Sequence, residues 1–367
     1  MTRRDVLRRR LATQRLHAAG LPSAADVVRL LGCVQSQEYA HALWSLGMRT
    51  SGLKVADAQA EFDGGDFLRT HILRPTWHFV AAEDIRWILE VTAPRVQKLN
   101  QTIYRRERLD PATLDRGLAL IVEQLQGGRY RTRAELGRAL ADQRLVSERL
   151  GLAYIVMNAE LEGVICSGPM RGAQQTYALL DERAPRSGDA DALRASANRA
   201  PPHGYTAELA RRFFLGHGPA SIQDLARWSS LTISQCRHAL EAIRDQLHCV
   251  TVEGVELWCD PNAPQVAPSP DALLLPLYDD LTLSYPLINF PQANGHPHAP
   301  GEDLFVGSVI IAETNVGIWR RTVQGRKMIM EIALAPGGVA RSRLLVEAAA
   351  SRLASFVGKE LELTITS

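Results

Sequence analysis

The stretch Ser221-Ile-Gln-Asp224-Leu-Ala-Arg-Trp228 decides the fold, because it begins a helix in a way that two other parts of the chain repeat. A hydroxyl residue is followed three positions later by a carboxylate, as in a capping box, where each side chain binds a free backbone N–H. Apolar residues follow at helical spacing. Residues 23–31 and 132–140 show the same pattern. The chain therefore contains an internal repeat.

The sequence on either side of each capping box repeats as well. An amphipathic helix is predicted before each box, at residues 6–16, 114–125 and 207–215. Further helices are predicted after it at 152–161 and, following a second box at Thr232–Gln235, at 236–247. Pairs of short β-prone runs come next, at 67–73 with 76–80, 164–167 with 175–180, and 248–252 with 255–259. Gly254 interrupts the last pair as a tight hairpin requires. Helices followed by a hairpin are the order of a winged helix-turn-helix.

The last hundred residues have a different character. Strands are predicted at 273–277, 305–312, 328–334 and 361–366, and an amphipathic helix at 341–357. Residues 181–202 and 260–270 are predicted linkers, and the loop 290–301 is placed to project into a ligand. We therefore predict an α+β chain with winged helices at 1–105, 106–200 and 201–262, and a small β-rich domain at 263–367. An unrelated α+β fold with coincidental caps is the alternative.

Composition narrows the class of protein. The 367 residues are 46% hydrophobic and 22% charged, with a net charge of +2, as in an ordinary globular protein. No apolar run approaches the ~18 residues that span a bilayer, and no signal-peptide core follows the basic N-terminus, so we expect a cytoplasmic protein. The five cysteines lack CxxC spacing, which argues against a zinc site or disulfide framework. Only four of the 42 cations are lysine; arginine suits phosphates, but a GC-rich genome explains most of this bias.

Specific motifs lie along nearly the whole chain, in a fixed order. They are Cys33-Val-Gln35-Ser-Gln37, residues 71–80 (His-Ile-Leu-Arg-Pro-Thr-Trp-His-Phe-Val) running on to Asp84-Ile-Arg-Trp87, residues 274–280, and Gly317-Ile-Trp319-Arg320-Arg321. Together they resemble the AlkZ/YcaQ-like family of bacterial DNA glycosylases. Two positions depart from the family pattern: Pro75 stands where glycine is expected, and Ser36 where an apolar residue is common. Both affect the expected substrate more than the reaction.

The resemblance implies a fold and an activity. The fold would be three tandem winged helices and a C-terminal β domain around a concave, DNA-sized channel. The activity would be monofunctional removal of N7-alkylguanine from duplex DNA, sometimes of bulky or crosslinked adducts. Separately, we expect a monomer that uses no metal or cofactor. Whether it serves general repair or antibiotic self-resistance is left open. In that family a Gln-x-Gln motif holds the attacking water, and Gln35 and Gln37 match it.

The chemistry of the substrate is compatible with a pair of glutamines as the water-positioning groups. Alkylation at N7 gives guanine a positive charge, so the base leaves readily and the enzyme has only to orient water and stabilise charge. An amide accepts from the water through its carbonyl and donates through its NH₂. Residues two apart share a side only in extended chain, so the helix begun at Ser23 must end near Cys33. Gly32 suits that break. Two solvated glutamines at a helix end are the alternative.

Other residues are weaker candidates. Glu38 is the rival group for activating water. DNA contacts are expected from Arg74, Thr76 and His78, and from Trp319, Arg320 and Arg321, although a salt bridge, a strand histidine and a structural tryptophan would explain them equally. Asp279 and Asp280 resemble a metal pair, but they are interpreted as anchors for arginines or as caps.

Two other functions compete with glycosylase activity. A non-catalytic winged-helix transcriptional regulator has the higher base rate, but it would normally dimerise on a palindrome, and no dimerisation arm is evident. An enzyme acting on other substrates through Asp279, Asp280 and histidines has no nucleotide-binding loop or triad spacing in its favour.

Overall fold

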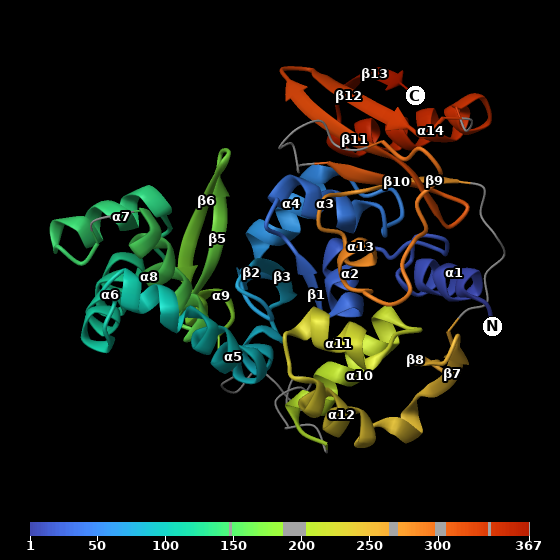
Figure 1. Ribbon diagram of the computed structural model, residues 1–367. Helices are drawn as coiled ribbons and strands as arrows, with labels where there is room; N and C mark the ends of the chain where they lie inside the picture. Colours follow the sequence, from blue (N-terminus) through green and yellow to red (C-terminus); the bar gives the residue numbers. More distant parts are fainter. Residues whose placement is uncertain (147–148, 186–202, 264–270, 298–305, 337–338, 367) are drawn as a thin grey trace. The chain divides into compact units, whose positions relative to one another are not determined.

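The chain forms two compact units in a computed structural model that describes residues 1–146, 149–185, 203–263, 271–297, 306–336 and 339–366 (Figure 1). Unit 1 comprises residues 1–59, 211–227 and 243–367, and unit 2 comprises 60–210 and 228–242. The predicted domain boundaries at 105, 200 and 262 are based on the sequence repeats, whereas the two units are defined by contacts between residues. The boundaries therefore stay a prediction. No helix in the described ranges is long and apolar enough to cross a membrane.

The first repeat contains four helices and a hairpin. Ser23 begins α2 as predicted, since its hydroxyl accepts from the Asp26 N–H at 3.0 Å. Helix α1 begins earlier than predicted because Thr2 and Asp5 form another capping box. The elements are α1 (Arg3–Thr13), α2 (Ala24–Leu31), β1 (Cys33–Gln35), α3 (Tyr39–Gly47), α4 (Val55–Gly64), β2 (Phe67–His71) and β3 (Trp77–Ala81).

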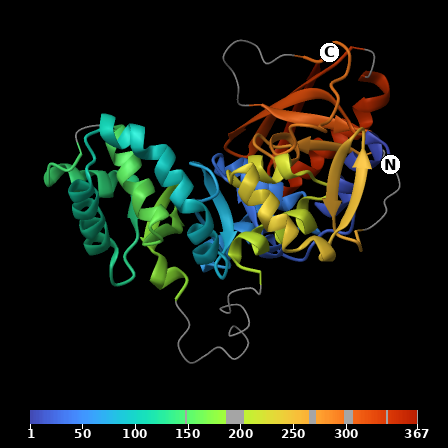
Figure 2. The same ribbon diagram turned by 60° about the horizontal axis from the view of Figure 1, so that its bottom comes forward.

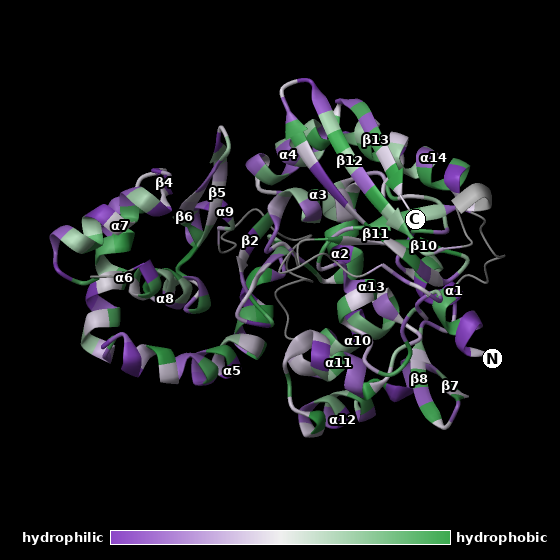
Figure 3. Cartoon of the chain, turned by 45° about the horizontal axis from the view of Figure 1, so that its top comes forward, coloured by the Kyte–Doolittle hydropathy of each residue, from purple (hydrophilic) through white to green (hydrophobic). Residues whose placement is uncertain are grey.

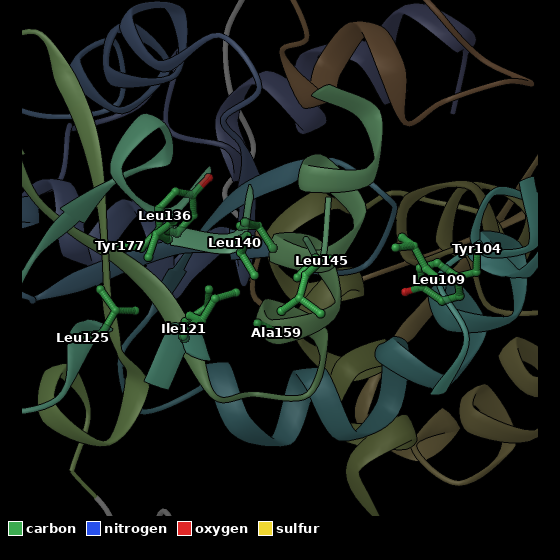
Figure 4. Packing of buried hydrophobic residues seen from close by; sticks show 12 residues of the cluster. Tyr104, Leu109, Ile121, Leu125, Leu136, Leu140, Leu145, Ala159 and Tyr177 are labelled. Carbon is green, nitrogen blue, oxygen red and sulfur yellow. The ribbon is translucent and has the colours of Figure 1, made fainter. Parts of the chain in front are cut away.

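The second repeat has its own hydrophobic core within unit 2. Leu136 and Leu140 of α7 meet Ile121 of α6 and Tyr177 of β6 in this core (Figure 4). The predicted capping box of Thr132 and Glu135 is present, and β6 lies between β4 and β5. The elements are α5 (Ile85–Arg106), α6 (Pro111–Leu125), β4 (Arg131–Thr132), α7 (Arg133–Asp142), α8 (Arg149–Leu161), β5 (Ile165–Arg171), β6 (Gln174–Leu179) and α9 (Leu180–Arg183). Helix α9 takes up the start of the predicted linker 181–202, and residues 186–202 lie outside the described residues.

The third repeat ends in the hairpin that the sequence predicts. Strands β7 (His248–Val252) and β8 (Val255–Cys259) have the predicted bounds. They pair antiparallel as a hairpin (Figure 2). Glu253 and Gly254 between them have positive φ values of 52° and 78°, as a two-residue hairpin turn of this kind requires. The predicted helix 236–247 is shorter, because α12 ends at Glu241 and a 3₁₀ turn follows. The other elements are α10 (Tyr205–His217), α11 (Ile222–Ser229), α12 (Ile233–Glu241) and η1 (Arg244–Gln246).

The C-terminal part is a five-stranded sheet in the order β13-β12-β11-β10-β9, with α14 packed on one face. Along β12, buried residues alternate with more exposed ones, and the strand carries both hydrophobic and hydrophilic residues (Figure 3). The elements are β9 (Ala272–Leu275), α13 (Asp280–Leu283), β10 (Gly307–Ile311), β11 (Thr314–Gln324), β12 (Lys327–Leu334), α14 (Val339–Val357) and β13 (Glu360–Thr366). Residues 264–270 of the second predicted linker, and 298–301 of the predicted loop, lie outside the described residues.

Candidate active site

The Gln35–Ser36–Gln37 motif lies in non-helical chain, as its proposed chemistry requires. Helix α2 ends at Leu31, and Gly32 follows with a φ of 74°, which confirms the predicted break. Cys33–Gln35 is then a strand. Val34 and Ser36 are buried at 3% and 0% exposure, while Gln35 and Gln37 are half-buried. This alternation is that of an extended segment, in which the two glutamines share the more exposed side.

Glu38 is placed beside the motif, at the start of α3. It occupies the N-cap position with an extended backbone, and its side chain makes no capping hydrogen bond. Its carbonyl accepts from the Ala42 N–H at 2.9 Å, which begins the helix. Glu38 as a whole is half-buried. It therefore remains a physical rival to the amides for activating water.

Behind the first turn of α3, an aromatic pair joins the motif segment to the C-terminal sheet. The His41 ring stacks on Trp319, with 5.4 Å between ring centroids and 16° between planes. The Trp319 indole N–H donates to the Leu275 carbonyl at 2.9 Å, and a Cβ at Gly307 would overlap this indole. Trp319 is only 1% exposed. Packing covers almost all of the Trp319 side chain. The direct contact between Trp319 and DNA that the sequence predicted is therefore not possible in this structure.

The two arginines after Trp319 point to opposite faces of β11. The Arg320 guanidinium is exposed and pairs with the Glu331 carboxylate at 2.5 Å across the sheet. Arg321 lies on the Trp319 face, where its Nη2 donates to the Ala40 carbonyl at 3.3 Å. Burial lowers the pKa of the Arg321 guanidinium. Only Arg321 of the two is therefore brought to the start of α3, beside the glutamine motif.

The turn between β2 and β3, in unit 2, presents Arg74. His78 donates through Nδ1 to the Thr76 carbonyl at 3.0 Å, and its Nε2 lies 3.3 Å from Arg74 Nη2, as an acceptor. Burial, and then the charge of Arg74, hold the pKa of His78 well below its ordinary value. His78 is 0% exposed and Arg74 is half-buried. The neutral histidine thus orients the arginine, rather than itself reaching a ligand.

A second histidine in unit 2 has an unexpected partner. His71 Nδ1 lies 2.5 Å from Glu160 Oε2, and the Trp77 indole N–H donates to Glu160 Oε1 at 3.1 Å. The Arg69 guanidinium lies over the Trp77 ring, 4.4 Å from its centroid. The motif at 71–80 contains His71 and Trp77, but no local sequence pattern indicates that their partner is Glu160, 89 positions after His71.

Asp279 is structural, as the sequence predicted. Its carboxylate oxygens each lie 3.0 Å from an Arg49 nitrogen, and both side chains are 0% exposed. The Ser45 hydroxyl and the Leu281 N–H also donate to it, so Asp279 caps α13. Burial alone would raise the pKa of Asp279, but the charge and hydrogen bonds of Arg49 outweigh it and the pKa is lowered. No group of three or more metal-ligating side chains occurs among the described residues.

Comparisons with known proteins identify the fold and the family of the chain. An interstrand DNA cross-link repair glycosylase from Streptomyces sahachiroi is 28% identical over 263 residues, which is 68% of this chain and 67% of that protein. The solved structure of the Streptomyces sahachiroi DNA glycosylase AlkZ matches with a TM-score of 0.77 at 23% identity, over 100% of both chains, and this confirms the predicted α+β winged-helix fold. The sequence profile of the DNA glycosylase AlkZ-like family matches residues 28–356. Since that match spans most of the chain, the protein belongs to the AlkZ-like family of DNA glycosylases.

Proposed function

We propose that this chain is a monofunctional DNA glycosylase that removes N7-alkylguanine from duplex DNA, and that Gln35 and Gln37 position the attacking water. The observation that carries the proposal is the shape of the motif segment. A helix that ends at a positive-φ glycine is followed by an extended run in which the two amides share the more exposed side. Had α2 continued through residue 37, the two amides would have pointed to nearly opposite sides.

The reaction that these residues would support is simple to balance. The C1′–N9 bond breaks, and its electron pair neutralises the cationic alkylated base, which leaves as neutral 7-alkylguanine. The amide carbonyls accept hydrogen bonds from a water, and the NH₂ groups donate to a sugar or phosphate oxygen. The water oxygen bonds to C1′ of the oxocarbenium-like sugar and loses a proton to solvent. The amides thus supply orientation, and the substrate supplies the leaving group.

The DNA contacts follow from the positions of the cations. Arg74, presented by the β2–β3 turn, and Arg321, beside α3, are proposed to bind backbone phosphates. Thr76 and His78 support the turn that carries Arg74, and Trp319 supports the strand that carries Arg321. Arg320 lies on the other face of β11, where it forms an exposed ion pair with Glu331. Because such a pair contributes little energy, Arg320 can give it up to bind a phosphate.

The range of adducts is the finer part of the proposal. The Streptomyces sahachiroi relative is named for interstrand cross-link repair, and it shares 28% identity with this chain. Crosslinks formed through guanine N7 present the same cationic base at each end, so the same water-positioning chemistry would release them. We therefore propose that bulky and crosslinked N7 adducts are substrates together with the methyl adduct.

The test is base release from a defined duplex. A single N7-methylguanine in a labelled duplex should become an alkali-labile abasic site with the wild-type chain. The double variant Gln35→Ala, Gln37→Ala should lose this activity and should keep duplex affinity within a few-fold. The Glu38→Gln variant is the matched control at the neighbouring position, and it should remain active because the carboxylate is not used. The same duplex with a bulky or a crosslinked N7 adduct tests the range.

Three results would contradict the proposal. Wild-type protein that binds the methylated duplex without releasing base would instead favour a non-catalytic DNA-binding protein. Loss of activity in Glu38→Gln, with activity kept in the double alanine variant, would assign water activation to the carboxylate. Release of the methylated base without release of either larger adduct would restrict the enzyme to small lesions.

A further inference from the structure

His41 has one ring nitrogen engaged and one available. It lies on the first turn of α3, four residues after Gln37. The backbone N–H of Leu277 donates to His41 Nδ1 at 3.1 Å, so Nδ1 is an acceptor and the neutral ring carries its hydrogen on Nε2. Within the described part of the chain, Nε2 has no hydrogen-bond partner, and it is not among the buried polar atoms that lack one. It is therefore a donor that solvent or a ligand can reach.

The orientation of this donor is fixed by the sheet. The imidazole stacks on Trp319, which is 1% exposed and tied through its indole N–H to the Leu275 carbonyl. Leu277, which donates to Nδ1, lies just after β9, the strand that ends at Leu275. Trp319 thus covers one face of the His41 ring, and the Leu277 N–H fixes one of its nitrogens. A donor fixed in this way loses little conformational freedom when it binds.

A cation lies beside this donor. Arg321 Nη2 contacts the carbonyl of Ala40, the residue before His41. Arg321 Nε is buried without a hydrogen-bond partner, and no ion pair among the described residues includes Arg321. Burial, and then the charge of Arg321, lower the pKa of His41 to about 4. At neutral pH the pair is therefore one arginine cation and one neutral histidine, without repulsion between them.

We infer that His41 and Arg321 together bind one backbone phosphate of the duplex, with His41 as an uncharged hydrogen-bond donor. The inference rests on the proposed function, and it adds a positioning residue to it. A phosphate offers several acceptor oxygens, so it can take the Nε2 hydrogen and pair with the guanidinium at the same time. Because both groups lie at the start of α3, directly after the motif, a phosphate held there would fix a neighbouring sugar relative to Gln35 and Gln37.

The experiment separates a neutral donor from a charge. Affinity for an undamaged labelled duplex is measured by fluorescence anisotropy over a series of salt concentrations. His41→Asn keeps an oxygen near the Nδ1 position to accept from Leu277 but has no donor at the Nε2 position. It should weaken binding about tenfold, the size of one good hydrogen bond, with the salt dependence unchanged. Arg321→Gln should weaken binding and reduce the slope of log affinity against log salt by about 0.9, as for one lost phosphate contact.

A second variant and a second reading keep the test decisive. His41→Gln carries its amide near the Nε2 position and should recover much of the affinity that His41→Asn loses. Thermal unfolding of each variant checks that the stack on Trp319 survives. If His41→Asn folds poorly, His41→Phe takes its place, because it keeps a ring to stack on Trp319 but has no donor, and it should also weaken binding at an unchanged slope.

The outcomes distinguish this inference from the proposed function. His41→Asn that binds like wild type, or that lowers the salt slope as Arg321→Gln does, overturns the neutral donor. Wild-type protein that binds the duplex, and whose variants behave as expected, supports the inference even if it releases no methylated base, which would contradict only the proposed activity. Wild-type protein that does not bind the duplex overturns both.

Discussion

The pair of Arg49 and Asp279 makes a large and specific stability prediction. Asp279→Ala leaves the Arg49 guanidinium buried at 0% exposure, with hydrogen bonds only to Gln14 and Ser45 and no carboxylate. Removing one partner of a buried ion pair costs about 3–5 kcal/mol, because the remaining charge is uncompensated. The matched control is Arg343→Ala, which breaks an exposed pair with Glu347 on α14 and should cost about 0.3–0.5 kcal/mol.

Urea unfolding followed by circular dichroism measures the difference. With a slope of about 3 kcal/mol per molar urea, Asp279→Ala should lower the midpoint by about 1–1.7 M. Because the chain has two compact units, the loss should fall on the transition of the unit that holds both residues. A loss below about 1 kcal/mol would refute the electrostatic argument. Stabilisation of wild type, but not of the variant, by a divalent metal ion would instead make Asp279 a ligand.

Three further predictions concern local features. Burial lowers the pKa of His217 to about 4, so between pH ~6.5 and 4 the unfolded chain binds a proton that the folded chain does not. The free energy of unfolding should therefore fall by up to about 1.4 kcal/mol for each pH unit below ~6.5. His217→Gln should reduce the pH dependence of the urea midpoint in this range. Thr132→Ala should cost about 1 kcal/mol of cap stability by thermal unfolding, whereas Thr132→Ser, which keeps the hydroxyl, should cost little. Gly47→Ala places a Cβ 2.5 Å from the Phe356 ring and should cost about 1–3 kcal/mol, and an equal cost in a Phe356→Leu background would contradict the overlap.

The parts of the fold that the sequence predicts are those set by neighbours in the chain. The hairpin β7–β8 has the predicted bounds because Glu253 and Gly254 can both adopt positive φ, which fixes the register of the two strands. The boxes at Thr132 and Thr232 form because the hydroxyl and its acidic or amide partner are three residues apart. Such signals need no knowledge of the rest of the molecule.

Two helices show how local signals can also be overlooked or misleading. Residues Thr2 to Asp5 carry the capping box pattern used elsewhere, and it places the start of α1 three residues before the predicted one. Helix α1 then ends at Thr13, and Arg15 has a positive φ of 62°. The 22-residue helix α5 contains Pro94 in its interior, where proline normally ends or kinks a helix. The sequence patterns therefore do not predict it.

The candidate site could be predicted only as far as its contiguous motif. The break at Gly32 and the extended course after it are local, and both are confirmed. The supports come from far along the chain: Asp279 lies 230 positions from Arg49, and Leu277 lies 236 positions from His41. Nothing in the spacing of one sequence indicates which of 42 cations each acid will meet. For the same reason His41, a lone histidine on a helix, gave no signal of its own.

The proposed use of neutral amides carries a consequence for selectivity. An unmodified guanine leaves as a high-energy anion unless a proton donor at the base neutralises it, and neither Gln35 nor Gln37 is acidic enough to be that donor. A cationic N7-alkylguanine leaves without that help. A site that can only orient water is therefore inactive on undamaged DNA because of the charge of the base, whatever the size of the adduct. On this argument the enzyme has no need of a close-fitting pocket to protect normal guanine, and a weak catalytic group is what permits both a wide range of adducts and safe contact with intact DNA.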